Sequence, residues 1–174
     1  MNQNFIIREA KPSEFNEIGD LLVLVYSQLK GFPAPEEQPA YYERLQHIGK
    51  FTDYPSTKLI VAIAPEGNIG GAVVYFGDMS YYGSGGTATK ETNASGFRLL
   101  GVDPALRGLG LGKRLTETCI QKARAEKQHQ LIIHSTKAMQ TAWKMYENMG
   151  FVRSLDLDFK QGELDVFGFR LNLE

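Results

Sequence analysis

The chain has 174 residues, of which 43% are hydrophobic and 22% charged, and its formal net charge is -1. A chain of this size can bury its own core, so we expect a single domain over residues 1–174. The near-neutral charge excludes a broad basic surface for nucleic acid, and the lack of a run of about 18 apolar residues argues against membrane insertion. Cys119 has no cysteine partner, and no signal-like leader is evident. These features predict a cytoplasmic protein with no nucleic-acid or membrane partner.

The first half of the chain predicts a mixture of helices and strands. Apolar residues at helical spacing mark the first helix, and a proline-containing segment separates it from a second, shorter one. Two runs rich in β-branched residues flank a Gly67-Asn68 turn and predict a hairpin. In chain order these elements are a strand at residues 5–8, a helix that starts near Pro12 and ends near Gly31, a helix at residues 41–48, and strands at residues 58–64 and 69–76.

The second half predicts alternating strands and helices that end in a hairpin. Before them, the segment at residues 81–89 is rich in Gly, Ser and Thr, and it predicts an exposed, mobile loop. The later elements follow from apolar periodicity and from Gly150 as a helix stop. They are a strand at residues 97–102, a helix from Leu111 to about Glu126, a strand at residues 131–133, a helix at residues 140–148, and strands at residues 151–159 and 165–173.

The most informative segment is residues 99–113, where an apolar strand, a Pro turn, a glycine-rich loop and a helix follow one another. Glycine recurs at every second position from Gly108 to Gly112, which lets backbone N–H groups approach a ligand closely. The helix adds its own unpaired N–H groups and the positive end of its dipole. Arg107 and Lys113 bracket the loop with two positive charges. The segment therefore predicts a site for phosphate or pyrophosphate.

Two common phosphate-binding motifs do not fit this spacing. A Walker A loop needs a glycine five positions before its Gly-Lys pair and a Ser or Thr after it, but those positions hold Arg107 and Arg114. The third glycine of a dinucleotide fingerprint would fall on Lys113 or Leu115. Neither a magnesium-dependent NTPase nor a dinucleotide-binding domain is indicated.

The loop instead resembles the pyrophosphate loop of the GNAT superfamily of acetyl-CoA-dependent N-acetyltransferases. The family signature Arg/Gln-x-x-Gly-x-Gly/Ala is met by Arg107, Gly110 and Gly112, and residues 100–104 resemble the strand and turn that precede it. A second family segment lies at residues 142–151, where a helix with Ala and Tyr four positions apart ends in Gly-Phe. The resemblance covers the chain from about Gly96 to its C-terminus.

This resemblance implies an α/β (α+β) fold with a mixed, mostly antiparallel sheet of about six to seven strands flanked by helices. In the family the sheet splays apart after the strand that here ends at Val102. It also implies that strand backbone pairs with the pantetheine arm and that loop amides hold the pyrophosphate. The residues assigned in this way to acetyl-CoA are Leu100, Gly101, Val102, Arg107, Gly108, Leu109, Gly110, Leu111, Gly112, Lys113 and Met139.

Tyr146 is the candidate catalytic residue by the same resemblance. A helix tyrosine in the family protonates the departing thiolate, and a phenol with a pKa near 10 is protonated at neutral pH. The alternative from periodicity alone is a core tyrosine packed beside Trp143 and Met145. Met139 stands where many relatives have Asn, so the cofactor contact there is expected to be apolar.

The group that deprotonates the acceptor is not assigned by the sequence. Relatives with a Glu-x-Arg strand entry carry a carboxylate two residues before the arginine, and this chain has Gly96 there. Glu91, Asp78, Tyr75 or a chain of waters remain as candidates. Arg98 is a candidate clamp for a substrate carboxylate, because Arg binds carboxylates in bidentate fashion, and the alternative is an arginine extended to solvent.

The lone cysteine and the three histidines could have catalytic or metal-binding roles, which we do not favour. His134 follows a buried strand, where a histidine satisfied by backbone groups is the better interpretation. Cys119 lies on an apolar helix stripe, which favours a packed thiol over an acyl-enzyme nucleophile. The three histidines lack the spacing of metal ligands, so no metal is expected.

The sequence therefore predicts an N-acetyltransferase that transfers the acetyl group of acetyl-CoA to a primary amine of a small molecule or amino acid derivative. We expect direct attack of the amine in a ternary complex. Two alternatives remain open: a non-catalytic sensor that binds acyl-CoA, and an acyltransferase with another acceptor or a longer acyl chain. The acceptor's identity and the oligomeric state, including a homodimer, are not defined by the sequence.

Overall fold

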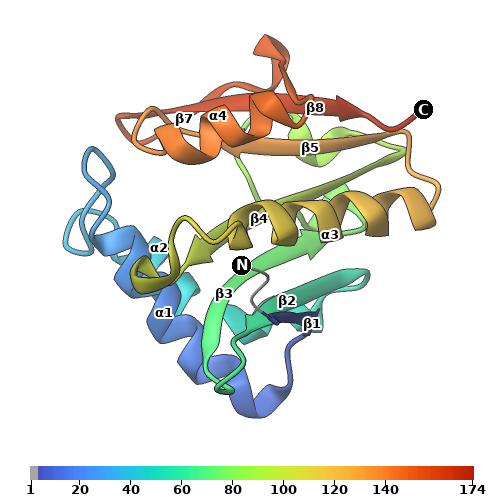
Figure 1. Cartoon of the computed structure of the whole chain (residues 1–174). Helices are drawn as coiled ribbons and strands as arrows, with labels where there is room; N and C mark the ends of the chain where they lie inside the picture. Colours follow the sequence, from blue (N-terminus) through green and yellow to red (C-terminus); the bar gives the residue numbers. More distant parts are fainter. Residues whose placement is uncertain (1–3) are drawn as a thin grey trace.

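The computed structural model describes residues 4–174 and contains one eight-stranded sheet. Its strands are β1 (Ile6–Glu9), β2 (Thr57–Ile63), β3 (Ile69–Phe76), β4 (Ala94–Val102), β5 (Gln130–Ser135), β6 (Val152–Arg153), β7 (Phe159–Gln161) and β8 (Leu164–Asn172). Their spatial order is β1-β2-β3-β4-β5-β8-β6, and β7 pairs with β8 (Figure 1). All pairs are antiparallel except β4 with β5. The predicted mixed, mostly antiparallel sheet is confirmed.

Helices cover both faces of this sheet. They are α1 (Phe15–Ser27), α2 (Pro39–Gln46), α3 (Leu111–Ala125) and α4 (Gln140–Asn148). Because side chains alternate along a strand, β2 sends Leu59 and Val61 into the core under α1 and α2. The intervening Ile60 and Ala62 enter the second core, under α3 and α4. The sheet thus separates two hydrophobic cores, and it is buried on both faces.

The sheet opens between β4 and β5 (Figure 1). These strands pair only where residues 94–96 lie beside residues 130–132, and beyond that point they have no ladder contacts. A bulge in β4 accompanies the opening: Leu99 has a φ of 62°, and the register against β3 shifts between Ala72 and Val74. The predicted splaying is therefore found, and it begins within β4, several residues before Val102.

The C-terminal region differs from the predicted two-stranded hairpin. The first expected strand, residues 151–159, divides into β6, a 3-10 turn at Leu155–Leu157 and the start of β7. β7 and β8 form the actual hairpin, with Phe159 opposite Val166. This division raises the strand count to eight from the expected six or seven.

Two boundaries and one loop also differ from the prediction. α1 ends at Ser27, four residues before Gly31, and α2 begins at Pro39, because a proline is favourable at the first helical position. The segment at residues 81–89 is not an exposed loop throughout: Tyr82 and Ala88 are both 0% exposed. Anchoring by these side chains, which the local Gly and Ser content does not reveal, gives the segment a fixed path.

Candidate active site

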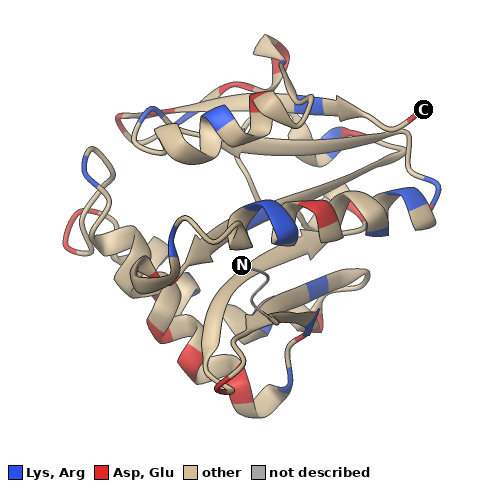
Figure 2. Ribbon diagram, in the orientation of Figure 1, with Lys and Arg blue, Asp and Glu red and all other residues tan. Residues whose placement is uncertain are grey.

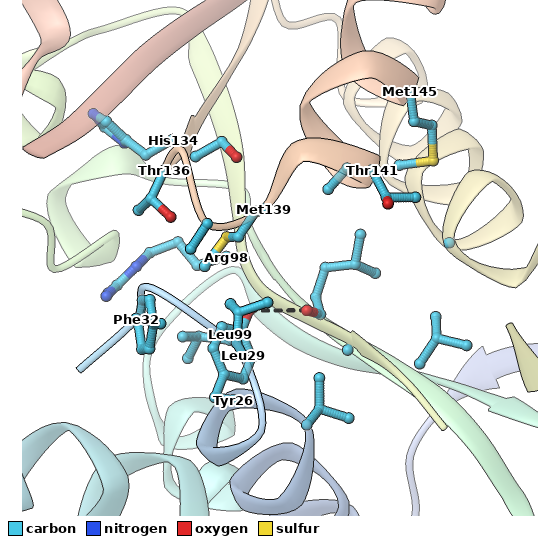
Figure 3. A pocket seen from close by; sticks show the side chains of 18 of the residues that line it. Tyr26, Leu29, Phe32, Arg98, Leu99, His134, Thr136, Met139, Thr141 and Met145 are labelled. Carbon is cyan, nitrogen blue, oxygen red and sulfur yellow. Dashed lines mark hydrogen bonds between the residues drawn. The ribbon is translucent and has the colours of Figure 1, made fainter. Parts of the chain in front are cut away.

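A cavity of about 600 Å³ lies where the sheet opens. Its walls come from α1 and the loop after it, α2, β4, the glycine-rich loop, the end of β5, α4, and the β7–β8 hairpin (Figure 3). The predicted cofactor and substrate residues that line it are Arg98, Leu100, Gly101, Val102, Arg107, Gly108, Gly110, Leu111, Gly112, Lys113, Met139 and Tyr146. Leu109 is the exception, since its side chain is 43% exposed and lies outside the lining. The fold brings all the others to one cavity.

The glycine-rich loop offers its backbone amides to this cavity. Among residues 4–174, no hydrogen-bond acceptor is found for the amides from Arg107 to Lys113, and the first bond of α3 runs from the Arg114 amide to the Gly110 carbonyl. Gly108 and Gly110 have φ values of 83° and 80°, in the left-handed region that a residue with a Cβ rarely adopts. Figure 2 shows basic residues where α3 begins. Free donors, a helix N-terminus and positive charge are the features that an anion site requires.

The opened part of β4 presents a free edge beside the loop. Residues 97–102 bond to β3 on one side and have no neighbouring strand on the other. The Tyr26 hydroxyl donates to the Leu100 carbonyl at 2.8 Å, which anchors α1 to this edge (Figure 3). Sequence analysis missed Tyr26 and the Leu99 bulge, because both depend on contacts between distant segments. An extended ligand could add to this edge as a strand does.

Tyr146 is both a core side chain and a residue of the cavity. It is 5% exposed, and its ring packs on Phe97 and Phe151 with centroids 5.9 and 5.6 Å away. Burial raises the pKa of its phenol, so the hydroxyl stays protonated at neutral pH. No hydrogen-bond partner for this hydroxyl is found in residues 4–174. The ring is held firmly while the hydroxyl remains available to donate.

Two buried hydroxyls at the end of β5 also lack partners. Ser135 and Thr136 are 2% and 4% exposed, both line the cavity, and neither hydroxyl has a hydrogen bond within the described chain. A buried polar group without a partner costs free energy, so such groups mark places where something else binds. Small polar residues directly after a buried strand were the available sequence signal, and the sequence analysis did not use it.

Arg98 projects into the cavity on the side of Phe32 and Thr136 (Figure 3). One guanidinium nitrogen donates to the Tyr82 carbonyl at 2.8 Å, and the guanidinium lies 5.7 Å from the centroid of the Tyr82 ring. Within residues 4–174 it has no carboxylate partner. Most of its five N–H donors are therefore free for a ligand.

His134 is held neutral with both ring nitrogens engaged. Nε2 lies 2.9 Å from the Leu157 carbonyl, which can only accept, so Nε2 carries the hydrogen. Nδ1 then accepts from the Tyr82 hydroxyl, also at 2.9 Å. Burial, with a smaller contribution from the positive charge of Arg98, lowers the pKa of His134 to about 4. This geometry favours the structural interpretation of His134.

The three side chains considered as general bases lie outside the cavity and are engaged elsewhere. Glu91 pairs with Arg170 at 2.7 Å, Asp78 accepts from Ser80, and Tyr75 donates to Glu126 at 2.6 Å. No Asp or Glu of residues 4–174 lines the cavity, and residues 1–3 carry no carboxyl side chain.

The structure also explains why the acidic position of some relatives is Gly96 here. A Cβ built on Gly96 would lie 2.7 Å from Tyr82 Cε1 and 2.8 Å from the Ile132 carbonyl oxygen. The Tyr82 ring, held by His134, fills the space that a longer side chain would need. The cavity therefore has no carboxylate of its own to accept a proton.

Cys119 and the histidines offer no further chemistry at this site. Cys119 is 0% exposed in the core under α3, and burial raises the pKa of its thiol. Within the described part of the chain, no three His, Cys, Asp or Glu residues are grouped as metal ligands would be. No helix in that part is long and apolar enough to cross a membrane.

Comparisons with known proteins agree with this geometry. A family model described as "Acetyltransferase (GNAT) family" matches residues 21–151. A GNAT-family acetyltransferase from Staphylococcus aureus Mu50 superimposes with a TM-score of 0.75 at 19% identity, over 98% of this chain and 99% of that chain. A GCN5-related N-acetyltransferase from Kribbella flavida gives 0.70 at 16% identity, over 97% and 98% of the two chains.

The yncA protein of Salmonella typhimurium, solved with its cofactor acetyl-CoA, gives a TM-score of 0.63 at 19% identity, over 98% of this chain and 95% of that chain. No curated protein sequence matches. The splayed sheet and the family-model match together indicate an acyltransferase of the GNAT type. The chain belongs to the GNAT acetyltransferase family.

Proposed function

We propose that this protein is an N-acetyltransferase that uses acetyl-CoA as co-substrate and acetylates a primary amine of a small molecule or amino acid derivative. The observation that carries the proposal is the set of unpaired amides from Arg107 to Lys113 at the mouth of the cavity. They match the oxygens of a pyrophosphate, and Arg107 and Lys113 supply the opposite charge. The bound acetyl-CoA in the Salmonella typhimurium structure supports this choice of donor.

The rest of the cavity suits the other parts of acetyl-CoA. The pantetheine arm would extend along the free edge of β4 at residues 97–102, with its amides bonding to strand backbone. Ser135 and Thr136 have hydroxyls that need partners, and the arm carries polar groups to satisfy them. Met139 lines the same cavity and would give an apolar contact.

Tyr146 acts as the general acid in this proposal. The amine attacks the thioester carbonyl, a C–N bond forms, and the C–S bond then breaks. Tyr146 donates its proton to the departing thiolate, and the attacking nitrogen releases one proton to solvent as the amide forms, from which the phenol is reprotonated. Backbone N–H groups near Leu100 polarise the carbonyl, and the fixed cavity supplies orientation. The buried phenol, protonated and without a partner, supports this role.

The acceptor loses its ammonium proton to water before it attacks. No carboxylate lines the cavity within residues 4–174, and His134 is already bonded at both nitrogens. The positive charge of Arg98 would further favour the neutral amine over the ammonium form. Arg98 has free donors and no counter-ion, which suits it to hold a carboxylate of the acceptor.

A pair of measurements tests the proposal. Calorimetry should show tight binding of acetyl-CoA and at least about hundredfold weaker binding of S-acetylpantetheine, which lacks the pyrophosphate. Thiol release should be detected with at least one amine from a broad panel. Equal affinity for the two donors would contradict the role of the loop. Binding of acetyl-CoA without transfer to any amine would instead favour a sensor.

A further inference from the structure

A second cavity of about 320 Å³ adjoins the first on the side away from the glycine-rich loop of residues 107–113. The two cavities share Tyr41, Ser84, Arg98, Phe159 and Gln161 in their linings. The walls of the second one come from α2, residues 83–85 and β7, which are far apart in the sequence. A ligand in the acetyl-transfer cavity can therefore extend past Arg98 into this space.

All the charged residues that line the second cavity are positive. They are Arg44, Arg98 and Lys160, and no Asp or Glu of residues 4–174 is among the lining residues. Arg98 has no ion-pair partner in that part of the chain, and Lys160 has only a long contact of 3.7 Å with the exposed Asp165. Cations that converge without carboxylates repel one another and attract an anion.

Backbone donors add to this positive wall. Among residues 4–174 no acceptor is found for the amides of Gly83, Ser84 and Gly85. Two contacts position the loop. The Tyr82 carbonyl accepts a hydrogen bond from Arg98, and Gly85 packs so closely on Phe159 that a Cβ built on it would lie 2.7 Å from Phe159 Cδ2. These amides and the three cations border the same space.

The rim of the second cavity is closed by a contact between α2 and β7. The side chains of Gln38 and Gln161 bond to each other, and Gln38 also donates to the Gln161 backbone carbonyl. This contact joins the start of α2, the helix that carries Arg44, to β7, the strand that carries Lys160. The two cations are thereby kept at one opening.

We propose that the second cavity binds an acidic group of the acceptor. The acceptors are then amines that carry a carboxylate or a similar oxyanion, and polycationic amines are rejected. Arg98 holds the near side of the anion, and Arg44 and Lys160 determine specificity from the far side. Tyr26, Phe32 and Tyr41, whose ring centroids are 5.5 to 6.1 Å apart, pack against the carbon skeleton. This assignment rests on the proposed acetyl transfer to an amine.

Kinetics with matched acceptors test the assignment. Amino acids are compared with their carboxamides, with aminoalkylphosphonates, and with spermidine as a polycation. The acid should exceed its carboxamide in kcat/KM by about tenfold or more, because Arg–carboxylate bonds are charge-assisted. The phosphonates show whether the cavity prefers carboxylate or a phosphorus oxyanion. Carboxamides or spermidine that match or exceed the acids would overturn the proposal.

Variants test whether the preference for acidic acceptors arises in the second cavity. Arg44→Ala and Lys160→Ala should each raise the KM for the acid about threefold, as expected for exposed charges. The KM values for the carboxamide and for acetyl-CoA should not change. Lys50→Ala removes an exposed charge outside both cavities and serves as the control. An unchanged KM for the acid in the double variant Arg44→Ala/Lys160→Ala would contradict the assignment.

A binding measurement separates this proposal from the proposed function. Succinate and methylphosphonate are titrated into the CoA-saturated protein, so that the loop of residues 107–113 is not free to bind them. At least one of the two should bind, and binding should weaken in Arg44→Ala/Lys160→Ala. If neither binds, the anion cavity is wrong whether or not transfer occurs. If one binds but no amine is acetylated, the proposed function is wrong and the anion cavity stands.

Discussion

The closed and open ends of the β4–β5 junction carry similar buried polar residues, but their hydrogen bonding differs. At the closed end, buried Ser95 bonds to Tyr75 at 2.8 Å, and Tyr75 also bonds to Glu126. At the open end, neither the buried Ser135 hydroxyl nor the Tyr146 hydroxyl has a hydrogen-bond partner among residues 4–174, and both residues line the cavity. At the closed end the polar groups hydrogen-bond to one another, whereas at the open end they are available to hydrogen-bond to a ligand.

This contrast locates the site more sharply than burial or residue type does. Serine and tyrosine occur at both ends, and each of these side chains is buried at 5% exposure or less. What differs is whether a hydrogen-bond partner is present, and unpartnered buried groups are costly unless something binds them. Variants at matched residues of the two ends can therefore test the contrast directly.

The largest effect is expected from the pair of tyrosines. Tyr146→Phe should lower kcat about 1000-fold, within the range for loss of a general acid, and leave the affinity for acetyl-CoA unchanged. Tyr75→Phe should leave kcat unchanged and lower the free energy of unfolding by about 2 kcal/mol, because it breaks a bond to a charged group. Steady-state kinetics and chemical denaturation measure the two quantities. Equal loss of kcat and cofactor affinity in Tyr146→Phe would mean that this tyrosine is structural.

His134 is the exception at the open end, because it is fully bonded, and it predicts a pH effect on stability. Its pKa in the folded protein is about 4, below the ordinary value of 6.5 for histidine, so the unfolded chain binds the proton more readily. Stability from this group is present above pH 6.5 and is lost as the pH falls toward 4, by up to about 3 kcal/mol. His134→Gln should flatten that part of the stability profile. Parallel profiles for wild type and His134→Gln would contradict the prediction.

Alanine substitutions at two glycines compare the glycine-rich loop with a turn outside the site. Gly110 and Gly67 have φ values of 80° and 95°, and a Cβ on either would meet nothing within 4 Å. Alanine at either site should cost about 1 kcal/mol of stability through backbone strain. Only Gly110→Ala should also raise the KM for acetyl-CoA, by about tenfold, because it displaces the converging amides. The same KM in both variants would argue against pyrophosphate binding by the loop.

The smallest effect comes from the two serines, and its sign should differ between them. Ser95→Ala should lower the free energy of unfolding, because it leaves Tyr75 without one of its partners. Ser135→Ala should raise that of the unliganded protein, by up to about 1 kcal/mol, because it removes an unsatisfied hydroxyl. The stabilisation gained on adding acetyl-CoA should shrink in Ser135→Ala. Denaturation with and without acetyl-CoA measures both, and a destabilised Ser135→Ala would mean that the hydroxyl has a partner.

Much of the fold was predictable because its signals are local in the sequence. Apolar periodicity, the Gly67-Asn68 turn and the glycine-rich loop are read from neighbouring residues, and the order of elements up to α4 is as predicted. The cofactor and substrate residues, apart from Leu109, do line one cavity. The motif fixes the local backbone conformation of the loop, so the place of its residues in the fold can be predicted from the sequence.

The features that sequence analysis missed depend on distant segments. The bulge at Leu99 arises from register against β3, and Tyr26 reaches the Leu100 carbonyl across 74 residues. Burial of Ser135 and Thr136 without partners follows from the opening of the sheet. The second cavity is assembled from α2, β7 and the segment after Tyr82, none of which carries a motif.

The packing of the Tyr82 ring over Gly96 has a consequence for how this chain can evolve. Any side chain at position 96 would collide with Tyr82 and with the Ile132 carbonyl. A mutation to Glu at this position would therefore damage the core before it supplied a proton acceptor. Acquiring one at this position requires a smaller residue at 82, which would also release His134, together with a shift of the β5 backbone at Ile132. The route from this chain to relatives that carry the acid thus passes through at least two coordinated substitutions.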